Sequence, residues 1–218
     1  MMQKSFLQRW TYCLTQLAVR GIAIILFSLR IFGSENWPRE GGALVCSNHQ
    51  SYFDPVIIGS SCSRRMNYLA RESLFRFFLF GWLIRWYDAI PIQREGMGIS
   101  GLKETMRRLK RGEMVLIFPE GTTTNGTCLI RFRTGAFVAG VPVQPVVVRL
   151  PFRHFSPTYE SIYTWVFVLR MLSQFHNRLD AEFLPAYVPS DEERRDPHVY
   201  ADNVRTAMAL HADLGFCC

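Results

Sequence analysis

The sequence lacks the cysteine spacings of a zinc site or a redox dithiol. Its six cysteines lie apart or at the very end of the chain, as Cys13, Cys46, Cys62, Cys128, Cys217 and Cys218. A chain of 218 residues can bury a core without a disulfide framework. We therefore expect reduced thiols and no metal site. The terminal pair in "GFCC" could accept palmitate at a membrane, or be two ordinary thiols at a frayed end.

A long apolar run without charge is also missing. A membrane-spanning helix needs about 20 mostly apolar residues. The best candidate, Leu14 to Phe32, is interrupted by Arg20 and Arg30, and an arginine near the bilayer centre costs about 3 kcal/mol on insertion scales. No small-x-small cleavage site of a secretory signal follows. We expect a helix that lies in or dips into one leaflet, with a full span as the close alternative.

Acidic residues are fewer than basic ones, 18 against 25, so the net charge is +7. A basic surface favours nucleic acid, an anionic membrane or a phosphorylated ligand. The 17 Phe and 5 Trp residues gather with Leu and Ile, as in "LFRFFLFGWLIRWY", whereas base-stacking surfaces interleave aromatic residues with Lys and Arg. This pattern favours a membrane partner and no nucleic acid.

Repeats and low-complexity tracts are absent, and the one candidate boundary is the turn-rich link "SENWPREGGA". We expect an N-terminal membrane-associated helical segment, residues 1–35, and one domain, residues 36–218. Strands are expected in "ALVCSN", "MNYLA", "DAIPIQR", "MVLIFPEG", "VPVQPVVVRL" and "AEFLP". Helices are expected in "VIIGSSC", "RESLFRFFLFGWLIRWY", "ISGLKETMRRLKRGE" (with a stripe of Ile99, Leu102, Met106 and Leu109), "YESIYTWVFVLRMLSQF" and "DPHVYADNVRTAMALHA". The alternation predicts an α/β fold with a mainly parallel central sheet flanked by helices.

The stretch "NHQSYFDP" places His49 just past an expected strand and Asp54 at an expected helix start. Asp54 before Pro55 is typical of a helix N-cap. A turn of this length can bring the carboxylate to one imidazole nitrogen and leave the other free, which is the arrangement that activates a hydroxyl. The alternative is that Asp54 is only a cap and His49 a loop residue. Cys46, three residues before His49, is interpreted as a buried strand residue.

The stretch "FPEGTTTNG", residues 118–126, follows another expected strand. Its backbone amides, hydroxyls and single carboxylate suit a phosphate or glycerol group, although a plain hairpin turn is an equal alternative. It is not a P-loop, since the second glycine, the lysine and the helix are missing. The chain also has no Gly-x-Ser-x-Gly nucleophile motif, which disfavours a hydrolase.

Four blocks in this order resemble the glycerolipid acyltransferase family: "NHQSYFD", "IPIQR", "FPEGTTTNG" and "VPVQPVVV". We call them the first to fourth blocks. Further on, "LIRFRTGAFVAGVPVQPVVVR" and "EFLPAYVPSDEERRDPHVYADNVRTAMA" are similar to the branch that acylates lysophosphatidylcholine and lysophosphatidylethanolamine. The resemblance implies that residues 36–218 form a membrane-bound acyltransferase domain, at the endoplasmic reticulum. Its substrates would be acyl-CoA and a lysophospholipid, with no bound cofactor and no metal.

The resemblance also implies residue roles. His49 would be the general base on the acceptor hydroxyl, and Asp54 would orient it. The glycerol-phosphate end of the acceptor would be positioned by Arg94, Glu120, Gly121 and Thr122. Pro142 in the fourth block would shape the acyl-CoA side.

One departure from the family pattern bears on the acceptor. Many members that accept lysophosphatidic acid carry an arginine two residues after the glycine of the third block, where this chain has Thr123. A phosphomonoester carries nearly two charges and favours such an arginine, whereas a phosphodiester carries one. The departure favours an acceptor with a choline or ethanolamine headgroup. Lysophosphatidic acid as acceptor, and a catalytically inactive lipid-binding or scaffold protein, are the alternatives.

Overall fold

The structure is a computed structural model that describes residues 6–51, 53–62, 64–76, 78–87, 89–93, 98–150, 166, 173 and 178–216. Its helices are α1 (Phe6–Phe27), α2 (Asp54–Ser61), α3 (Phe78–Trp86), α4 (Gly98–Lys110), α6 (Asp191–Arg195) and α7 (Pro197–Ala212). Three short 3-10 helices are η1 (Ser34–Asn36), η2 (Glu72–Arg76) and η3 (Gly135–Ala139). The strands are β1 (Leu29–Phe32), β2 (Ala43–Ser47), β3 (Met66–Arg71), β4 (Ile90–Ile92), β5 (Met114–Ile117), β6 (Cys128–Leu129), β7 (Val143–Arg149), β8 (Leu179–Phe183) and β9 (Gly215–Phe216).

Seven strands form the central sheet in the order β1-β8-β7-β2-β5-β3-β4. All neighbouring pairs are parallel except β7 and β8, which are antiparallel. The predicted α/β fold with a mainly parallel sheet is therefore confirmed. The expected strand "AEFLP" belongs to β8, which runs opposite to β7, and β1 follows the direction of β8; the sequence did not indicate this reversal.

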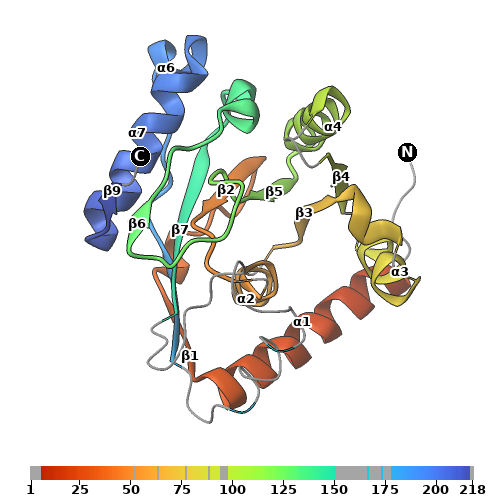
Figure 1. The fold of residues 1–218 in the computed structure, drawn as a ribbon. Coiled ribbons are helices and arrows are strands. Elements are labelled where there is room, and N and C mark those ends of the chain that lie inside the picture. The colour runs from red at the N-terminus through yellow and green to blue at the C-terminus, as the bar shows by residue number, and fades with distance from the viewer. Residues whose placement is uncertain are drawn as a thin grey trace.

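Helices cover both faces of the sheet (Figure 1). On one face, α1 and α2 pack against Val45, Leu116 and Val146. On the other, α4, η3 and α7 pack against Leu44, Val115 and Val147. Neighbouring residues of one strand thus pack into the hydrophobic cores on opposite faces of the sheet, because side chains alternate across a sheet. Strands buried on both faces read as continuous apolar runs, which is why they were recognisable.

The N-terminal helix is shorter at its C-terminal end than expected. The stretch Leu14 to Phe32 was predicted as one helix, but α1 ends at Phe27 and Leu29–Phe32 forms strand β1. Ser28 has a positive φ of 43°, which ends the helix. Strand β1 then pairs with β8, and Arg30 forms two hydrogen bonds with Asp180, each 2.7 Å long. Pairing across 150 residues overrides local helix propensity here.

Two further expectations need correction, and others concern residues that the structure does not describe. In α4 the buried line is Gly101, Thr105 and Leu109, whereas Ile99 of the predicted stripe is 76% exposed. The expected helix "YESIYTWVFVLRMLSQF" lies almost entirely outside the described residues, as do Cys217 and Cys218. Cys128 is disulfide-bonded, so the expectation of reduced thiols is wrong for that residue. Cys13, Cys46 and Cys62 are free.

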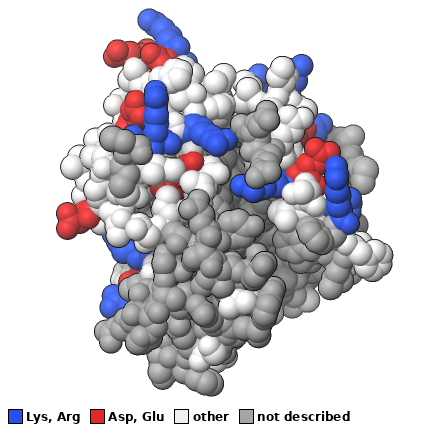
Figure 2. Space-filling model, in the orientation of Figure 1, with Lys and Arg blue, Asp and Glu red and all other residues white. Residues whose placement is uncertain are grey.

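Charged side chains of both signs are mixed on the surface. On the face drawn in Figure 2, Lys and Arg side chains lie beside Asp and Glu side chains in a few groups, and most of the described surface carries neither. The basic excess of the sequence is thus not gathered into one uniform basic patch on the described part of this face.

Candidate active site

His49 lies in the loop that leaves the carboxyl end of β2, in the middle of the sheet. This loop, residues 48–53, connects β2 to α2. In parallel α/β sheets ligands bind at the carboxyl ends of the strands. The next strand across, β5, ends at the same edge and continues into Phe118, Pro119 and Glu120. The sheet therefore brings the first and third blocks side by side.

The imidazole of His49 is held by Asp54. The distance from His49 Nδ1 to Asp54 Oδ2 is 2.8 Å, so Nδ1–H donates and Nε2 keeps its lone pair. The imidazole stacks on the ring of Phe118, with centroids 4.1 Å apart. Among the described residues no hydrogen-bond partner is recorded for Nε2, and 18% of the side chain is exposed. The free nitrogen has the geometry of a general base.

Asp54 is not the helix N-cap that the sequence predicted. It is the first residue of α2, and its carboxylate turns back to the loop instead of forward to the next helical amides. Oδ2 accepts hydrogen bonds from the backbone N–H of Gln50 (2.7 Å) and Ser51 (2.8 Å) in addition to His49. The side chain is fully buried. Asp54 therefore folds the loop around the imidazole, and α2 begins without a side-chain cap, with Pro55 in its first turn.

Cys46 is fully buried in β2, as predicted. Burial raises the pKa of its thiol well above the usual range. A thiol without thiolate character is a poor nucleophile. The interpretation of Cys46 as a packing residue is confirmed.

Glu120 contacts the His49 loop directly. One carboxylate oxygen accepts the backbone N–H of His49 at 2.8 Å, and the other accepts the N–H of Ile130 at 3.4 Å. The backbone N–H of Thr124 in turn donates to the carbonyl of His49 at 2.7 Å. The third block thus holds both backbone groups of His49. The predicted contact between Glu120 and the acceptor stays a prediction.

Burial raises the pKa of Glu120 from 4.5 to about 7, although the hydrogen bonds from the amides of His49 and Ile130 act in the opposite direction. A carboxyl group with a raised pKa binds more protons in the folded state than in the unfolded state. The free energy of unfolding should therefore fall as pH rises from about 4.5 to about 7. We expect this fall to be about 1–3 kcal/mol smaller in Glu120→Gln than in the wild type. Urea unfolding at several pH values measures it, and identical pH profiles would contradict it.

The other predicted site residues are placed as follows. Gly121 adopts φ +72°, and a Cβ on it would lie 2.5 Å from Nε of Arg133. Thr122 is exposed beside it. Pro142 lies at the opposite edge of the sheet, because its carbonyl binds the N–H of Leu44 near the start of β2. From Leu44 the strand runs three residues further to Ser47, roughly 10 Å, before the loop that carries His49 begins. Arg94 lies outside the described residues.

Sequence reasoning missed three features of this site. Phe118 supports the imidazole face, and Arg133 places a guanidinium beside the third block, where Thr123 supplies no charge. The side chains of Asn48 and Gln50 bind Val148 of β7 and the following Leu150, on the other side of His49. Of these features, only the Asn48 and Gln50 contacts could have been suspected from the sequence, because two carboxamide side chains flank the histidine. The described residues contain no group of three or more His, Cys, Asp or Glu side chains suited to a metal ion.

Comparisons with known proteins show the family to which the chain belongs. The family described as "Acyltransferase" matches residues 28–149, more than half of the chain. The chain is 38% identical to lysophospholipid acyltransferase LPEAT1 of Arabidopsis thaliana over 186 residues, 81% of this chain and 46% of that protein. It is 36% identical to lysophosphatidylcholine acyltransferase 1 of Homo sapiens over 190 residues, 81% of this chain and 34% of that protein. The chain thus spans less than half the length of these curated relatives.

A solved structure has the same fold. It is the 1-acyl-sn-glycerophosphate (LPA) acyltransferase PlsC from Thermotoga maritima, with a TM-score of 0.70 and 19% sequence identity. The match covers 100% of this chain and 86% of that one.

Proposed function

Since the chain belongs to the acyltransferase family, we propose that it transfers an acyl group from acyl-CoA to the free hydroxyl of a lysophospholipid. The observation that carries the proposal is the His49–Asp54 pair, in which Nδ1 is hydrogen-bonded and Nε2 has no recorded partner among the described residues. The names of the relatives support a lysophospholipid acceptor.

The proposed reaction is a direct transfer. His49 Nε2 takes the proton of the acceptor hydroxyl while the hydroxyl oxygen attacks the thioester carbonyl carbon. Asp54 faces the Nδ1–H and stabilises the imidazolium. The carbon–sulfur bond then breaks, and the CoA thiolate leaves and takes the proton from His49. A thioester is already activated, so a base and correct alignment suffice. No acylated enzyme is needed.

For the acceptor, we propose lysophosphatidylcholine or lysophosphatidylethanolamine, with lysophosphatidic acid as the alternative. A phosphodiester headgroup carries one negative charge, and the third block has Thr123 in place of a cation. Arg133, whose guanidinium approaches Gly121, is a candidate partner for that single phosphate. The purified protein in detergent, given acyl-CoA and each lysolipid, tests this through release of free CoA thiol. A preference for lysophosphatidic acid would reverse the acceptor assignment, and no release with any lysolipid would favour the scaffold alternative.

We further propose that α1 and α3 attach the protein to the membrane of the endoplasmic reticulum. No helix in the described part of the chain is long and apolar enough to cross a membrane. The buried side of α1 packs against α2, whereas its outer side exposes Trp10, Leu14, Leu17, Ile24 and Ile25 by 49–80%. This division is typical of a helix lying in the interface plane. In Figure 1, α1 runs along one edge of the molecule toward α3.

The segment formed by η2 and α3 adds to this surface. Tyr12 of α1 contacts Tyr87 at the end of α3, with ring centroids 5.6 Å apart. Phe78 is 94% exposed and Trp82 58%. An open hollow of about 720 Å³ between η2 and α3 is lined by Glu72, Phe75, Arg76, Phe78, Trp82 and Arg85. Exposed aromatic side chains beside arginines are typical of the membrane interface.

The protein is expected to remain on liposomes in 1 M salt. Charge attraction is screened there beyond about 3 Å, whereas apolar burial persists. Leu14→Glu/Leu17→Glu should lower the membrane-bound to free ratio on the order of 100-fold, because two leucine side chains leave the lipid. Leu210→Glu is the matched control, since Leu210 is 76% exposed but lies on α7. Liposome flotation measures the ratio. If 1 M salt releases the wild type, the protein is held to the membrane by charge alone and the proposed apolar attachment is wrong.

A further inference from the structure

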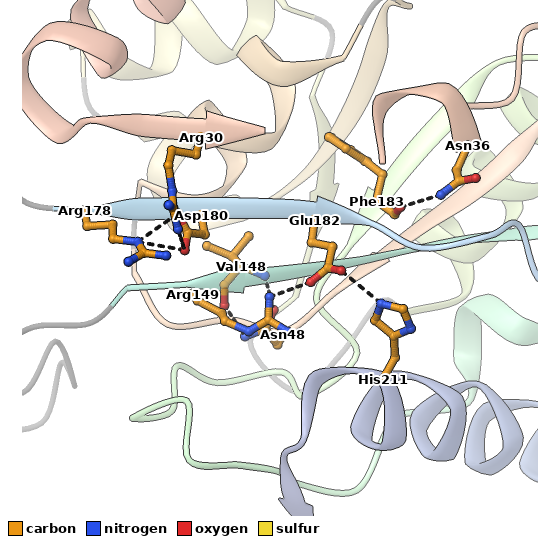
Figure 3. A network of polar contacts seen from close by, with 10 residues as sticks. All are labelled: Arg30, Asn36, Asn48, Val148, Arg149, Arg178, Asp180, Glu182, Phe183 and His211. Atoms are coloured by element: carbon orange, nitrogen blue, oxygen red, sulfur yellow. Dashed lines mark hydrogen bonds and ion pairs between the residues drawn. The ribbon is translucent and has the colours of Figure 1, made fainter. Parts of the chain in front are cut away.

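The side chains on either side of His49 are bound to the end of strand β7 and to Leu150, the residue that follows it. Asn48 is 1% exposed. Its Nδ2 donates to the carbonyl of Val148 at 2.9 Å, and its Oδ1 accepts the N–H of Val148 at 2.8 Å (Figure 3). Gln50 is 4% exposed, and its Oε1 accepts the N–H of Leu150 at 2.9 Å. Two side-chain carboxamides thus bind the chain at the end of β7, one within the strand and one just after it.

These bonds continue the pairing of β2 with β7 beyond the end of β2. The backbone ladder ends at Ser47, which pairs with Val146. Past this point the chain turns toward α2, and Val148 and Leu150 would lose their partners. The carboxamides of Asn48 and Gln50 replace the missing backbone groups. A buried backbone group without a partner costs about 1–3 kcal/mol in general, so this replacement gives the loop a defined position.

His49 is held from the other side of β2. In the sheet β2 lies between β7 and β5. The backbone N–H and carbonyl of His49 bind Glu120 and Thr124, which follow β5. The side chains of Asn48 and Gln50 bind Val148 of β7 and Leu150 just after it. Opposing attachments at three consecutive residues leave the His49 backbone little freedom.

Gly126 at the end of the third block makes room for Gln50. It has φ +75°, and a Cβ on it would lie 1.3 Å from Nε2 of Gln50. A side chain at residue 126 would therefore displace the Gln50 carboxamide from its hydrogen bond with Leu150. The first and third blocks therefore meet at Gln50, whereas the fourth block reaches the loop through its last residue, Val148, which binds Asn48.

We propose that Asn48 and Gln50 are positioning residues that set the place of the His49 imidazole for acyl transfer by anchoring its loop to β7. The expected loss of kcat rests on the proposed acyltransferase function. The expected loosening of the loop rests on the hydrogen bonds alone. A displacement of about 1 Å in a reacting group can lower a rate on the order of 100-fold. Binding of either substrate need not change.

The test compares Asn48→Ala with Asn67→Ala in the full chain. Asn67 is the matched control: it is 2% exposed and bridges two strands, with its Nδ2 donating to the carbonyl of Met114 at 2.9 Å. It lies near the start of β5, at the other edge of the sheet. We expect Asn48→Ala to lower kcat about 100-fold, with each KM within about threefold of the wild type. Asn67→Ala should lower the melting temperature but keep kcat within about threefold.

Hydrogen exchange of the peptide 46–55 provides the second measurement, which needs no activity. It should become faster in Asn48→Ala and stay unchanged in Asn67→Ala. Gln50→Met, which keeps the volume but leaves the N–H of Leu150 unpaired, covers the case that Asn48→Ala does not fold. We expect about a tenfold loss of kcat and faster exchange of the same peptide.

The proposal would be overturned by normal kcat in the folded variants, by an equal loss in Asn67→Ala, or by unchanged exchange of the peptide 46–55. If the wild type itself transfers no acyl group, the proposed function fails. Hydrogen exchange of the peptide 46–55 then still decides whether the bond between Asn48 and β7 holds the His49 loop in place.

Discussion

Replacing His49 by alanine is expected to lower acyl transfer by about 10²–10⁴-fold, the usual contribution of a positioned general base. The Nε2 atom is the group that would take the hydroxyl proton, and nothing in the His49 loop can replace it at that position. Gln50 and Ser51 carry no base, and the Asp54 carboxylate is buried behind the imidazole, bound to backbone amides. The substrate KM values should change little, since the imidazole acts on the reacting atoms.

The control for this variant is His211→Ala. His211 also faces a carboxylate, with Nε2 2.9 Å from Glu182 (Figure 3), but it lies on α7 and 47% of its side chain is exposed. Loss of this surface pair should cost less than about 1 kcal/mol in stability and nothing in rate. Thiol release from acyl-CoA is the readout, with thermal unfolding of both variants alongside. Near-normal turnover in folded His49→Ala would exclude the proposed mechanism.

Asp54→Asn is expected to lower kcat by a similar factor, about 10²–10⁴. Asparagine can place its oxygen where Oδ2 accepts three hydrogen bonds, so the loop can keep its shape. It supplies no charge opposite the imidazolium that forms in the reaction. Because bonds to a charged acceptor are stronger than bonds to a neutral one, the free energy of unfolding should also fall by about 1–3 kcal/mol. A helix cap would predict almost no change in stability, since asparagine caps as well as aspartate.

The double variant decides whether Asp54 acts through His49. If it does, His49→Ala/Asp54→Asn should be no slower than His49→Ala alone, since residues that act as a unit are not additive. Steady-state kcat for the four proteins gives the answer. A further loss of tenfold or more in the double variant would assign Asp54 a separate role.

The elements that sequence reasoning found were those whose stability is local or repeated along the chain. Ala43–Ser47 and Met114–Ile117 are buried on both faces and are apolar throughout. The closing helix, expected over residues 196–212, is α7, which begins at Pro197, and Asp196 before it accepts the N–H of His198 at 2.9 Å. The pairing of His49 with Asp54 spans five residues, so one tight turn creates it. Each of these depends on neighbours close in the sequence.

The remainder was decided by contacts between distant parts of the chain. Leu29–Phe32 became a strand because β8 pairs with it, and β8 runs antiparallel to β7 although its own sequence carries no sign of direction. Asn48 meets Val148 across 100 residues, and Glu120 meets the His49 backbone across 71. Pro142 belongs to a block that looks functional in the sequence, yet it lies at the edge of the sheet away from His49. Sequence composition and spacing determined which residues carry the chemistry. Strand order and register decided which of them meet, because those depend on pairing energies that no local stretch contains.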